Sequence, residues 1–407
     1  TVVVSGNITD EEGSSISGVS VALEGSEFNN AQTNANGAFE FPEMNSGGTY
    51  NLKPQSANDF TNGVSTMDMI HVQRHLLAIN AINSPYKMIA ADVNKDGKIS
   101  AMDLLETRNL ILGVNNGFKN NTSWKYINAD YQFENEANPI TESYPESELI
   151  TKISEDVHAD FIGVKIGDLT NDASLNGLPA VETRNSSKLV LELDSEGFAK
   201  DQLIEVPVYA SDFNQINGFQ YTLNYNAGKL GFSGIEAGAL DMNENNFFAH
   251  SDGIVTMSWS QALPVDVKEG NVLFTLKFAG KANGDLYESV SLSSAVTKAE
   301  AYGKELEKMD VQLVFRNVES TDFELFQNTP NPFSERTDIT FNMKESGFAT
   351  INVFDVTGKQ IRTIAQVFGK GKNTVTVDLK DSGINGVLYY QLTADGFTST
   401  RKMIVVK

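Results

Sequence analysis

Apolar and polar residues alternate along most of the chain, and this period of two predicts β-strands. The alternation is clearest over residues 188–316, where Phe219 and Tyr221 stand between polar neighbours. Shorter alternating runs, separated by Gly, Asn and Ser turns, fill residues 1–53 and return over residues 325–407. The pattern therefore predicts three β-sandwich modules, each with its own core.

One stretch has a helical period instead. Residues 67–79 and 102–114 carry apolar residues at the spacing of amphipathic helices. They belong to an internal repeat, because the segment from Val64 to Ile70 aligns with the segment from Ile99 to Leu105. Ser-x-x-Asp opens both helices, which is typical of a capping box. The sequence thus predicts two copies of a loop followed by a helix.

A chain of 407 residues exceeds the size at which one hydrophobic core keeps growing, so several domains are expected. The predicted fold class is mainly β and multidomain, with three β-sandwich modules and one small α-helical unit. The expected boundaries are a first sandwich at 1–54, the helical unit with an extension at 55–172, a linker at 173–187, a second sandwich at 188–318 and a third at 319–407. Residues 161–168 are expected to end the extension as a strand.

Composition and charge limit the classes of function that this chain can have. Hydrophobic residues make up 40% of the chain, which indicates packed cores rather than disorder. The net charge of −22 disfavours binding to nucleic acid. Without cysteine there is neither a disulfide framework nor a thiolate zinc site, and no apolar run is long enough to predict a membrane-spanning helix. Thr1 leads directly into a strand-like run, so we expect any signal peptide to be already removed or not included.

Residues 92–103 have the spacing of a calcium-binding loop. Side-chain oxygens fall at loop positions 1, 3, 5, 9 and 12, a backbone carbonyl at 7, and a glycine at 6, where the turn needs a positive φ. The expected ligands are the side chains of Asp92, Asn94, Asp96, Ser100 and Asp103 and the backbone carbonyl of Lys98. Because calcium takes about six to eight oxygen ligands, the sequence predicts a calcium site. The alternative is a solvated Asp/Asn turn.

The first copy of the loop, residues 57–68, has fewer oxygens because Ala57 occupies position 1. The expected ligands of this weaker second site are Asp59, Thr61, Ser65 and Asp68. Two interpretations stay open at this point. The loop either holds calcium, with Asn58 taking part after a local slip, or it is a turn held by side-chain hydrogen bonds.

Other candidate residues are less specific. His71 and His75 have the helical spacing of a zinc pair, but no acidic third ligand follows them, so ordinary histidines are expected. Trp124, Tyr126 and Tyr131 could stack on a sugar, although aromatic residues in a β-rich segment more often belong to a core. No carboxylate pair suited to glycoside hydrolysis can be singled out. The sequence therefore predicts no catalytic residue and no enzyme.

Several segments resemble known families. The segments Gly6–Asp10 and Thr33–Phe39 make residues 1–54 similar to carboxypeptidase-regulatory or Cna B-type sandwiches. Some relatives carry a Lys–Asn isopeptide crosslink, but the only lysine here is Lys53, so no crosslink is expected. The doubled loop and helix, with Asp at position 12 of the second loop, resembles an EF-hand-like type I dockerin. The order of apolar runs from Gln202 to Phe274 resembles a cohesin.

Residues 325–407 closely resemble the type A sorting domain of the type IX secretion system of Bacteroidetes. The matching residues are Pro330-Asn331-Pro332-Phe333, Asp355 to Lys359, Gly386 to Tyr390 and Lys402 to Lys407. Basic residues outnumber acidic ones here, unlike in the rest of the chain. The resemblance implies recognition of 325–407 by shuttle proteins and the outer-membrane translocon. The polar stretch 317–322 before it is an expected place for proteolytic cleavage.

Together the resemblances imply a secreted or outer cell-surface protein that passes transiently through the periplasm. We expect a non-enzymatic, calcium-binding adhesion, scaffold or stalk protein, and the C-terminal part of a longer one. The alternative is an accessory part of a secreted polysaccharide-degrading enzyme or a cellulosome-like assembly. Calcium is the expected cofactor. The expected partners are the export machinery, a cohesin–dockerin contact within or between chains, and a polysaccharide, with no nucleic acid.

Overall fold

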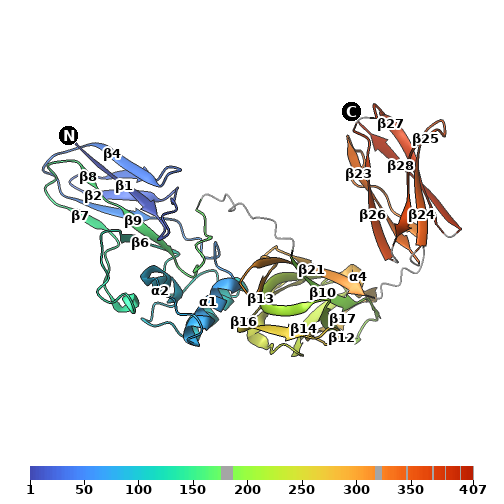
Figure 1. Ribbon diagram of the computed structural model, residues 1–407, viewed down its shortest axis with the longest axis horizontal. Coiled ribbons are helices and arrows are strands. Elements are labelled where there is room, and N and C mark those ends of the chain that lie inside the picture. The colour runs from blue at the N-terminus through green and yellow to red at the C-terminus, as the bar shows by residue number, and fades with distance from the viewer. Residues whose placement is uncertain are drawn as a thin grey trace. The chain divides into compact units, whose positions relative to one another are not determined.

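A computed structural model describes residues 1–175, 187–316, 323–344, 347–368, 371–380, 382–394 and 396–406. Most of the predicted linker 173–187 and the predicted cleavage stretch 317–322 lie outside the described residues. The structure is about 48% strand and 10% helix, which confirms the mainly β class (Figure 1). The chain divides into two compact units. The first consists of residues 1–193 and 197–314, and the second consists of residues 194–196 and 315–407.

The first sandwich joins the N-terminal residues to strands from much later in the chain. Its strands are β1 (Val2–Thr9), β2 (Ser20–Gly25), β3 (Asn29–Gln32), β4 (Ala38–Met44), β5 (Tyr50–Gln55), β6 (Trp124–Asn128), β7 (Glu148–Ile150), β8 (Val157–His158) and β9 (Phe161–Lys165). One sheet has the order β4-β1-β9-β6, with β8 also pairing with β1, and the other has the order β3-β2-β5-β7. Strands of residues 124–165 thus extend both sheets of the N-terminal sandwich.

The helical module, residues 57–112, lies between these two groups of strands in the sequence. Its helices are α1 (Thr66–Leu76), α2 (Pro85–Ala91) and α3 (Ala101–Ile111), and a 3-10 turn η1 (Pro139–Thr141) follows. Ser65 and Ser100 form the capping boxes that the sequence predicts, with Asp68 and Asp103 as their partners. Positive φ angles at Ala78 and Gly113 follow the ends of α1 and α3, a backbone conformation that stops a helix.

The second sandwich is formed from residues 188–316. Its elements are β10 (Lys188–Asp194), β11 (Gly197–Phe198), β12 (Leu203–Ala210), β13 (Phe213–Tyr225), β14 (Leu230–Ala237), η2 (Glu244–Asn246), β15 (Phe247–Ala249), β16 (Ile254–Val267), β17 (Phe274–Gly280), β18 (Gly284–Asp285), α4 (Leu286–Ser289), β19 (Val290–Ser293), β20 (Glu300–Gly303) and β21 (Lys308–Arg316). The main sheet has the order β14-β17-β12-β10-β21-β20-β13-β16-β15. Trp259 and Phe219 stack in its core, with ring centroids 5.5 Å apart.

The central strand β13 departs from simple alternation. Its inward residues Phe219 and Tyr221 are buried, as the pattern predicts, but so are the outward residues Gln220 and Thr222. Both faces of β13 are therefore covered, and α1 lies against its outer face and that of β16 (Figure 1).

The C-terminal sandwich, residues 323–406, has a separate core. Its strands are β22 (Glu324–Leu325), β23 (Arg336–Met343), β24 (Gly347–Asp355), β25 (Gln360–Phe368), β26 (Gly371–Asp378), β27 (Gly386–Ala394) and β28 (Phe397–Val405). They form one sheet of order β22-β23-β26 and one of order β25-β24-β27-β28. Ile339, Ile351 and Tyr390 are fully buried between the two sheets.

Candidate calcium loops and docking interface

The second loop, residues 92–103, wraps its backbone around its own side-chain oxygens. The Asp92 carboxylate accepts hydrogen bonds from the amides of Asp96 (3.1 Å) and Gly97 (3.0 Å). Asn94 Oδ1 accepts a second bond from the Asp96 amide at 2.8 Å. Gly97 has a φ of 82°, so the sharp turn occurs where a glycine makes it inexpensive. The turn thus holds the side chains of positions 1 and 3 on its inner side.

The other end of the loop is tied back to its beginning. Asp103 accepts from the amide of Asn94 (3.3 Å) with one oxygen and from the amide of Ser100 (2.8 Å) with the other. Asp92, Asn94 and Asp103 are buried, whereas Asp96 and Lys98 lie exposed at the tip. Burial raises the pKa of both the Asp92 and Asp103 carboxyls, because a charge without water is less stable. A cation would relieve this cost.

The donor set of the second loop fits calcium. It combines carboxylate, amide, hydroxyl and carbonyl oxygens, which are the hard ligands that this ion prefers. In the described part of the chain, no three His, Asp or Glu side chains converge closely enough to hold a metal ion. The fit therefore rests on ligand chemistry and loop conformation.

The first loop, residues 57–68, uses its oxygens differently. Asp68 accepts from the amide of Ser65 (2.8 Å) and from that of Leu169 (2.7 Å), beyond the repeat. The amide group of Asn62 exchanges hydrogen bonds with the backbone of Ser174. Of the predicted ligands, Ser65 and Asp68 are buried, while Asp59 and Thr61 are exposed. Two side chains of this loop, Asp68 and Asn62, thus bind the backbone of Leu169 and Ser174, which lie beyond the repeat.

The less specific candidates have ordinary structural roles. His75 Nδ1 accepts from the amide of Ile82 (3.1 Å), and partial burial lowers the pKa of His71. Trp124 and Tyr126 stack in the core of the first sandwich and are 9% and 3% exposed. Tyr131 donates to Glu142 at 3.1 Å. With Trp124 and Tyr126 buried, they present no open platform to a sugar.

A polar docking interface joins the helical module to the second sandwich. At the start of α1, the Thr66 amide donates to Gln220 Oε1 (2.7 Å), and the Thr66 hydroxyl shares a hydrogen bond with that of Ser258 (2.8 Å). All three side chains are buried. Further along α1, Arg74 donates to the carbonyls of Ala262 (3.0 Å) and Lys304 (3.1 Å).

The end of α3 completes this docking interface. The last carbonyls of a helix have no partner within it. Here the Thr297 hydroxyl donates to the Ile111 carbonyl and the Thr256 hydroxyl to the Leu112 carbonyl, both at 2.6 Å. Arg108 adds a bond to the Ser260 hydroxyl at 3.3 Å. The second sandwich therefore caps the C-terminus of α3.

An apolar contact lies next to these polar pairs. Met67 and Ile70 of α1 pack on Tyr302 of β20, and Ile70 and Tyr302 are completely buried. Gly218 permits the close approach, because a Cβ there would lie 3.1 Å from Ile70 Cδ1 and 2.9 Å from the Trp259 carbonyl. This surface could not be predicted from the sequence, because Gln220 and Ser258 look like solvent-facing residues of a strand.

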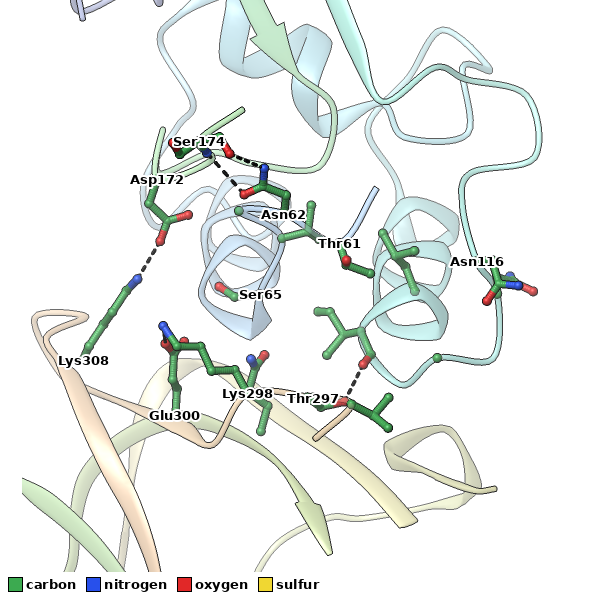
Figure 2. A pocket seen from close by; sticks show the side chains of 18 residues that line it. Thr61, Asn62, Ser65, Asn116, Asp172, Ser174, Thr297, Lys298, Glu300 and Lys308 are labelled. Carbon is green, nitrogen blue, oxygen red and sulfur yellow. Dashed lines mark hydrogen bonds and ion pairs between the residues drawn. The ribbon is translucent and has the colours of Figure 1, made fainter. Parts of the chain in front are cut away.

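A cavity of about 620 Å³ opens beside the docking interface (Figure 2). Figure 2 shows ion pairs at its wall, and Lys308 lies 2.6 Å from Asp172. Lys298 and Glu300 form a second pair at 2.7 Å. The Asn62–Ser174 hydrogen bonds and Thr297 also line the cavity, on opposite sides of it in Figure 2. Charged and amide groups thus line the cavity, and the Lys308–Asp172 ion pair joins β21 to the segment that follows β9.

In the C-terminal sandwich, the residues that carry the sorting-domain resemblance shape turns and the core. Asp355 Oδ1 accepts from the amides of Thr357 (2.8 Å) and Lys359 (3.0 Å), and Gly358 has a φ of 83°. The buried Tyr390 donates its hydroxyl to the Phe326 carbonyl at 2.7 Å. These motif residues therefore shape one turn and the core of the C-terminal sandwich.

Three family models match parts of the chain. Residues 61–112 match the dockerin type I domain, residues 189–313 the cohesin domain, and residues 329–406 the secretion system C-terminal sorting domain. These matches confirm the resemblances that the sequence predicts for the three segments. Among curated proteins, no relative matches the chain.

Solved cohesins are similar to part of this chain. The sixth cohesin of scaffoldin B from Acetivibrio cellulolyticus, solved with a mutant Cel5 dockerin, is 20% identical, with 31% of this chain and 95% of that chain covered and a TM-score of 0.26. A non-cellulosomal cohesin from Archaeoglobus fulgidus is 17% identical, with 32% and 91% covered and a TM-score of 0.24.

The matched modules define the class of protein. Cohesin, dockerin and sorting domains together support a secreted modular protein of the cellulosome-like kind. All three are non-catalytic modules, and type I dockerins are known to bind calcium. The sorting domain implies export to the cell surface or secretion. In the ranges that the structure describes, no helix is both long and apolar enough to cross a membrane.

Proposed function

We propose that this chain is a surface-exported adhesion or scaffold protein whose dockerin-like module binds calcium and docks on the cohesin-like sandwich of the same chain. The buried hydrogen bonds of Thr66 with Gln220 and Ser258 carry the proposal. Polar side chains with so little exposure need partners, because an unpaired buried donor or acceptor costs about 1–3 kcal/mol. The two surfaces supply these partners to each other.

Calcium would be held by the second loop. Asp92, Asn94, Asp96, Ser100 and Asp103 offer side-chain oxygens, and Lys98 offers its carbonyl. A bound ion would neutralise the acidic side chains that the loop gathers. Because the loop runs directly into α3, the free energy of ion binding would also stabilise the folded state of this helix.

Docking within one chain is favoured by the covalent connection. The helical module with its extension, residues 55–172, is joined to the second sandwich through the predicted linker 173–187, which gives each a high effective concentration near the other. The docked arrangement buries Thr66, Ile70 and Gln220 at once. We therefore propose that the cohesin-like surface is occupied by the chain's own α1 and α3, and that an external dockerin would have to displace them.

A cleavage experiment on the whole chain tests this docking. A protease recognition sequence placed within residues 176–186 allows the purified chain to be cut between the two modules. The two halves should then elute together in size-exclusion chromatography. Ile70→Glu, which places a charge at a fully buried position, should separate them, whereas Leu76→Glu on the exposed side of α1 should not. Halves of the unsubstituted chain that elute separately would disprove docking in cis.

The binding character of the interface supports an adhesion, scaffold or stalk role. Its residues pair hydroxyls, amides and carbonyls, and the proposed ion serves to hold a loop. The rival role, as an accessory of a polysaccharide-degrading assembly, predicts binding to polysaccharide. Sedimentation of the chain with insoluble polysaccharides discriminates between them, because co-sedimentation would favour the accessory role.

A further inference from the structure

Lys165, the last residue of β9, directs a buried ammonium group toward the first loop. Lys165 is only 4% exposed. Nζ donates to the carbonyl of Phe60, inside the first loop, at 3.1 Å and to the carbonyl of Ile166 at 3.3 Å. Burial lowers the pKa of Lys165 to about 8, while the negative charges of Asp168, Asp59 and Asp68 raise it. The two carbonyl acceptors and the surrounding carboxylates favour the charged ammonium form of this side chain.

Two buried carboxylates, Asp168 and Asp68, lie near the ammonium of Lys165. Asp168 is 2% exposed, and its Oδ2 lies so close to Gly63 that a Cβ on this glycine would be 2.6 Å from it. Asp168 accepts from the amides of Asn171 (2.8 Å) and Ala173 (2.9 Å). Asp68, at the end of the loop, is equally buried. One buried cation, Lys165, and two buried carboxylates, Asp68 and Asp168, thus lie in or against the first loop.

The neighbouring strand provides a comparison. Lys125 of β6 is also 4% exposed, and β6 pairs with β9. Its ammonium lies 2.8 Å from Glu146 and 5.6 Å from the centre of the Tyr144 ring. Lys125 is therefore neutralised by a carboxylate outside the two loops, whereas Lys165 donates to a loop carbonyl. Burial of a lysine in this sheet does not by itself place a cation in a loop.

We propose that the ammonium of Lys165 is the resident cation of the first loop, so that this loop takes no calcium and the helical module binds a single ion. The inference concerns the same module as the proposed function and rests on it for the ion of the second loop. Ala57 removes the ligand at position 1, and a calcium ion beside the ammonium would be repelled by a like charge. Lysine is suited to this role because its ammonium is a compact point charge with three donors.

The inference predicts that α1 and α3, the two helices of the docking interface, differ in their dependence on calcium. The start of α1, with Thr66 and Ile70, is held by a covalently attached cation and does not depend on calcium. Only α3, which follows the second loop, depends on the ion. Calcium removal should therefore loosen one side of the interface and leave the other in place.

Isothermal titration with calcium chloride on the intact chain tests the inference. The unsubstituted chain should bind one ion. Asp92→Ala/Asp96→Ala, which disables the second loop, should bind none, and calcium binding by this variant would overturn the inference. That measurement needs no change at Lys165, so it decides even if substitutions there prevent folding.

Further substitutions in the Asp92→Ala/Asp96→Ala chain distinguish the effect of Lys165 from that of the missing ligand at position 1. Ala57→Asp alone should still bind no calcium, whereas Ala57→Asp/Lys165→Met should bind one ion. Ala57→Asp/Lys125→Met is the matched control and should bind none. Binding by Ala57→Asp alone, or no binding by a folded Ala57→Asp/Lys165→Met chain, would overturn the role of Lys165. If the unsubstituted chain itself binds no calcium, the proposed ion of the second loop fails, and these variants still decide the first.

Discussion

Truncation of Ile70 is the most direct test of the docking interface. Ile70 is completely buried and packs on Met67 and Tyr302, so Ile70→Ala leaves a cavity between α1 and β20. Such a truncation costs about 2–5 kcal/mol. If the interface bears this cost, the equilibrium constant for its opening rises roughly 30- to 4000-fold, since about 1.4 kcal/mol is a factor of ten.

Hydrogen exchange measured by mass spectrometry reports this opening. Peptides that cover β13 and β16 contain the strand surfaces covered by α1, and their exchange should accelerate in Ile70→Ala. Leu76→Ala, on the same helix but 39% exposed, is the matched control and should change exchange little. Equal exchange of these peptides in the two variants would show that α1 does not protect the second sandwich, and the reasoning would be refuted.

The remaining predictions concern the glycine of the interface, the ion and the export signal. Gly218→Val should weaken docking, because a Cβ at this position already lies 3.1 Å from Ile70 Cδ1 of α1 and the larger side chain would crowd it. The opened chain should elute earlier in size-exclusion chromatography, and elution at the volume of the unsubstituted chain would contradict this. Calcium chelation should lower the melting temperature of the helical module and leave the C-terminal sandwich unchanged, with Asp92→Ala/Asp96→Ala giving the same result without chelator; melting that is independent of calcium would exclude a structural ion. Deletion of residues 325–407 should retain the protein in the periplasm, and fusion of 325–407 behind a signal peptide and a fluorescent protein should export that protein; secretion of the deleted chain and retention of the fusion would together refute the export role.

Local features of the helical module could be predicted because they depend on residues close in sequence. The capping boxes of Ser65 and Ser100 and the positive φ of Gly97 follow from patterns a few residues long. The short helix α2 was missed, although Ser84 before Pro85 is a usual start signal. Its seven residues are too few for a clear apolar period.

Features that join distant segments could not be predicted. The parallel pairing of Ile8 with Phe161 brings β9 into the first sandwich, and a strand of five residues carries no sign of its partner. Lys165 at its end looks like an ordinary exposed lysine until the first loop is placed over it. The similarity of residues 1–54 to Cna B-type sandwiches and the predicted domain boundaries stay predictions.

The 11-residue helix α3 connects two events that would otherwise be independent. The second loop lies at its N-terminus, and the hydroxyls of Thr256 and Thr297 hold the carbonyls at its C-terminal end. Thermodynamic linkage is reciprocal, so any stabilisation of docking by calcium must be matched by an equal gain in calcium affinity on docking. A chain opened by a competing partner would release its ion more easily, and the surrounding calcium concentration would set how readily the chain exchanges its own module for another.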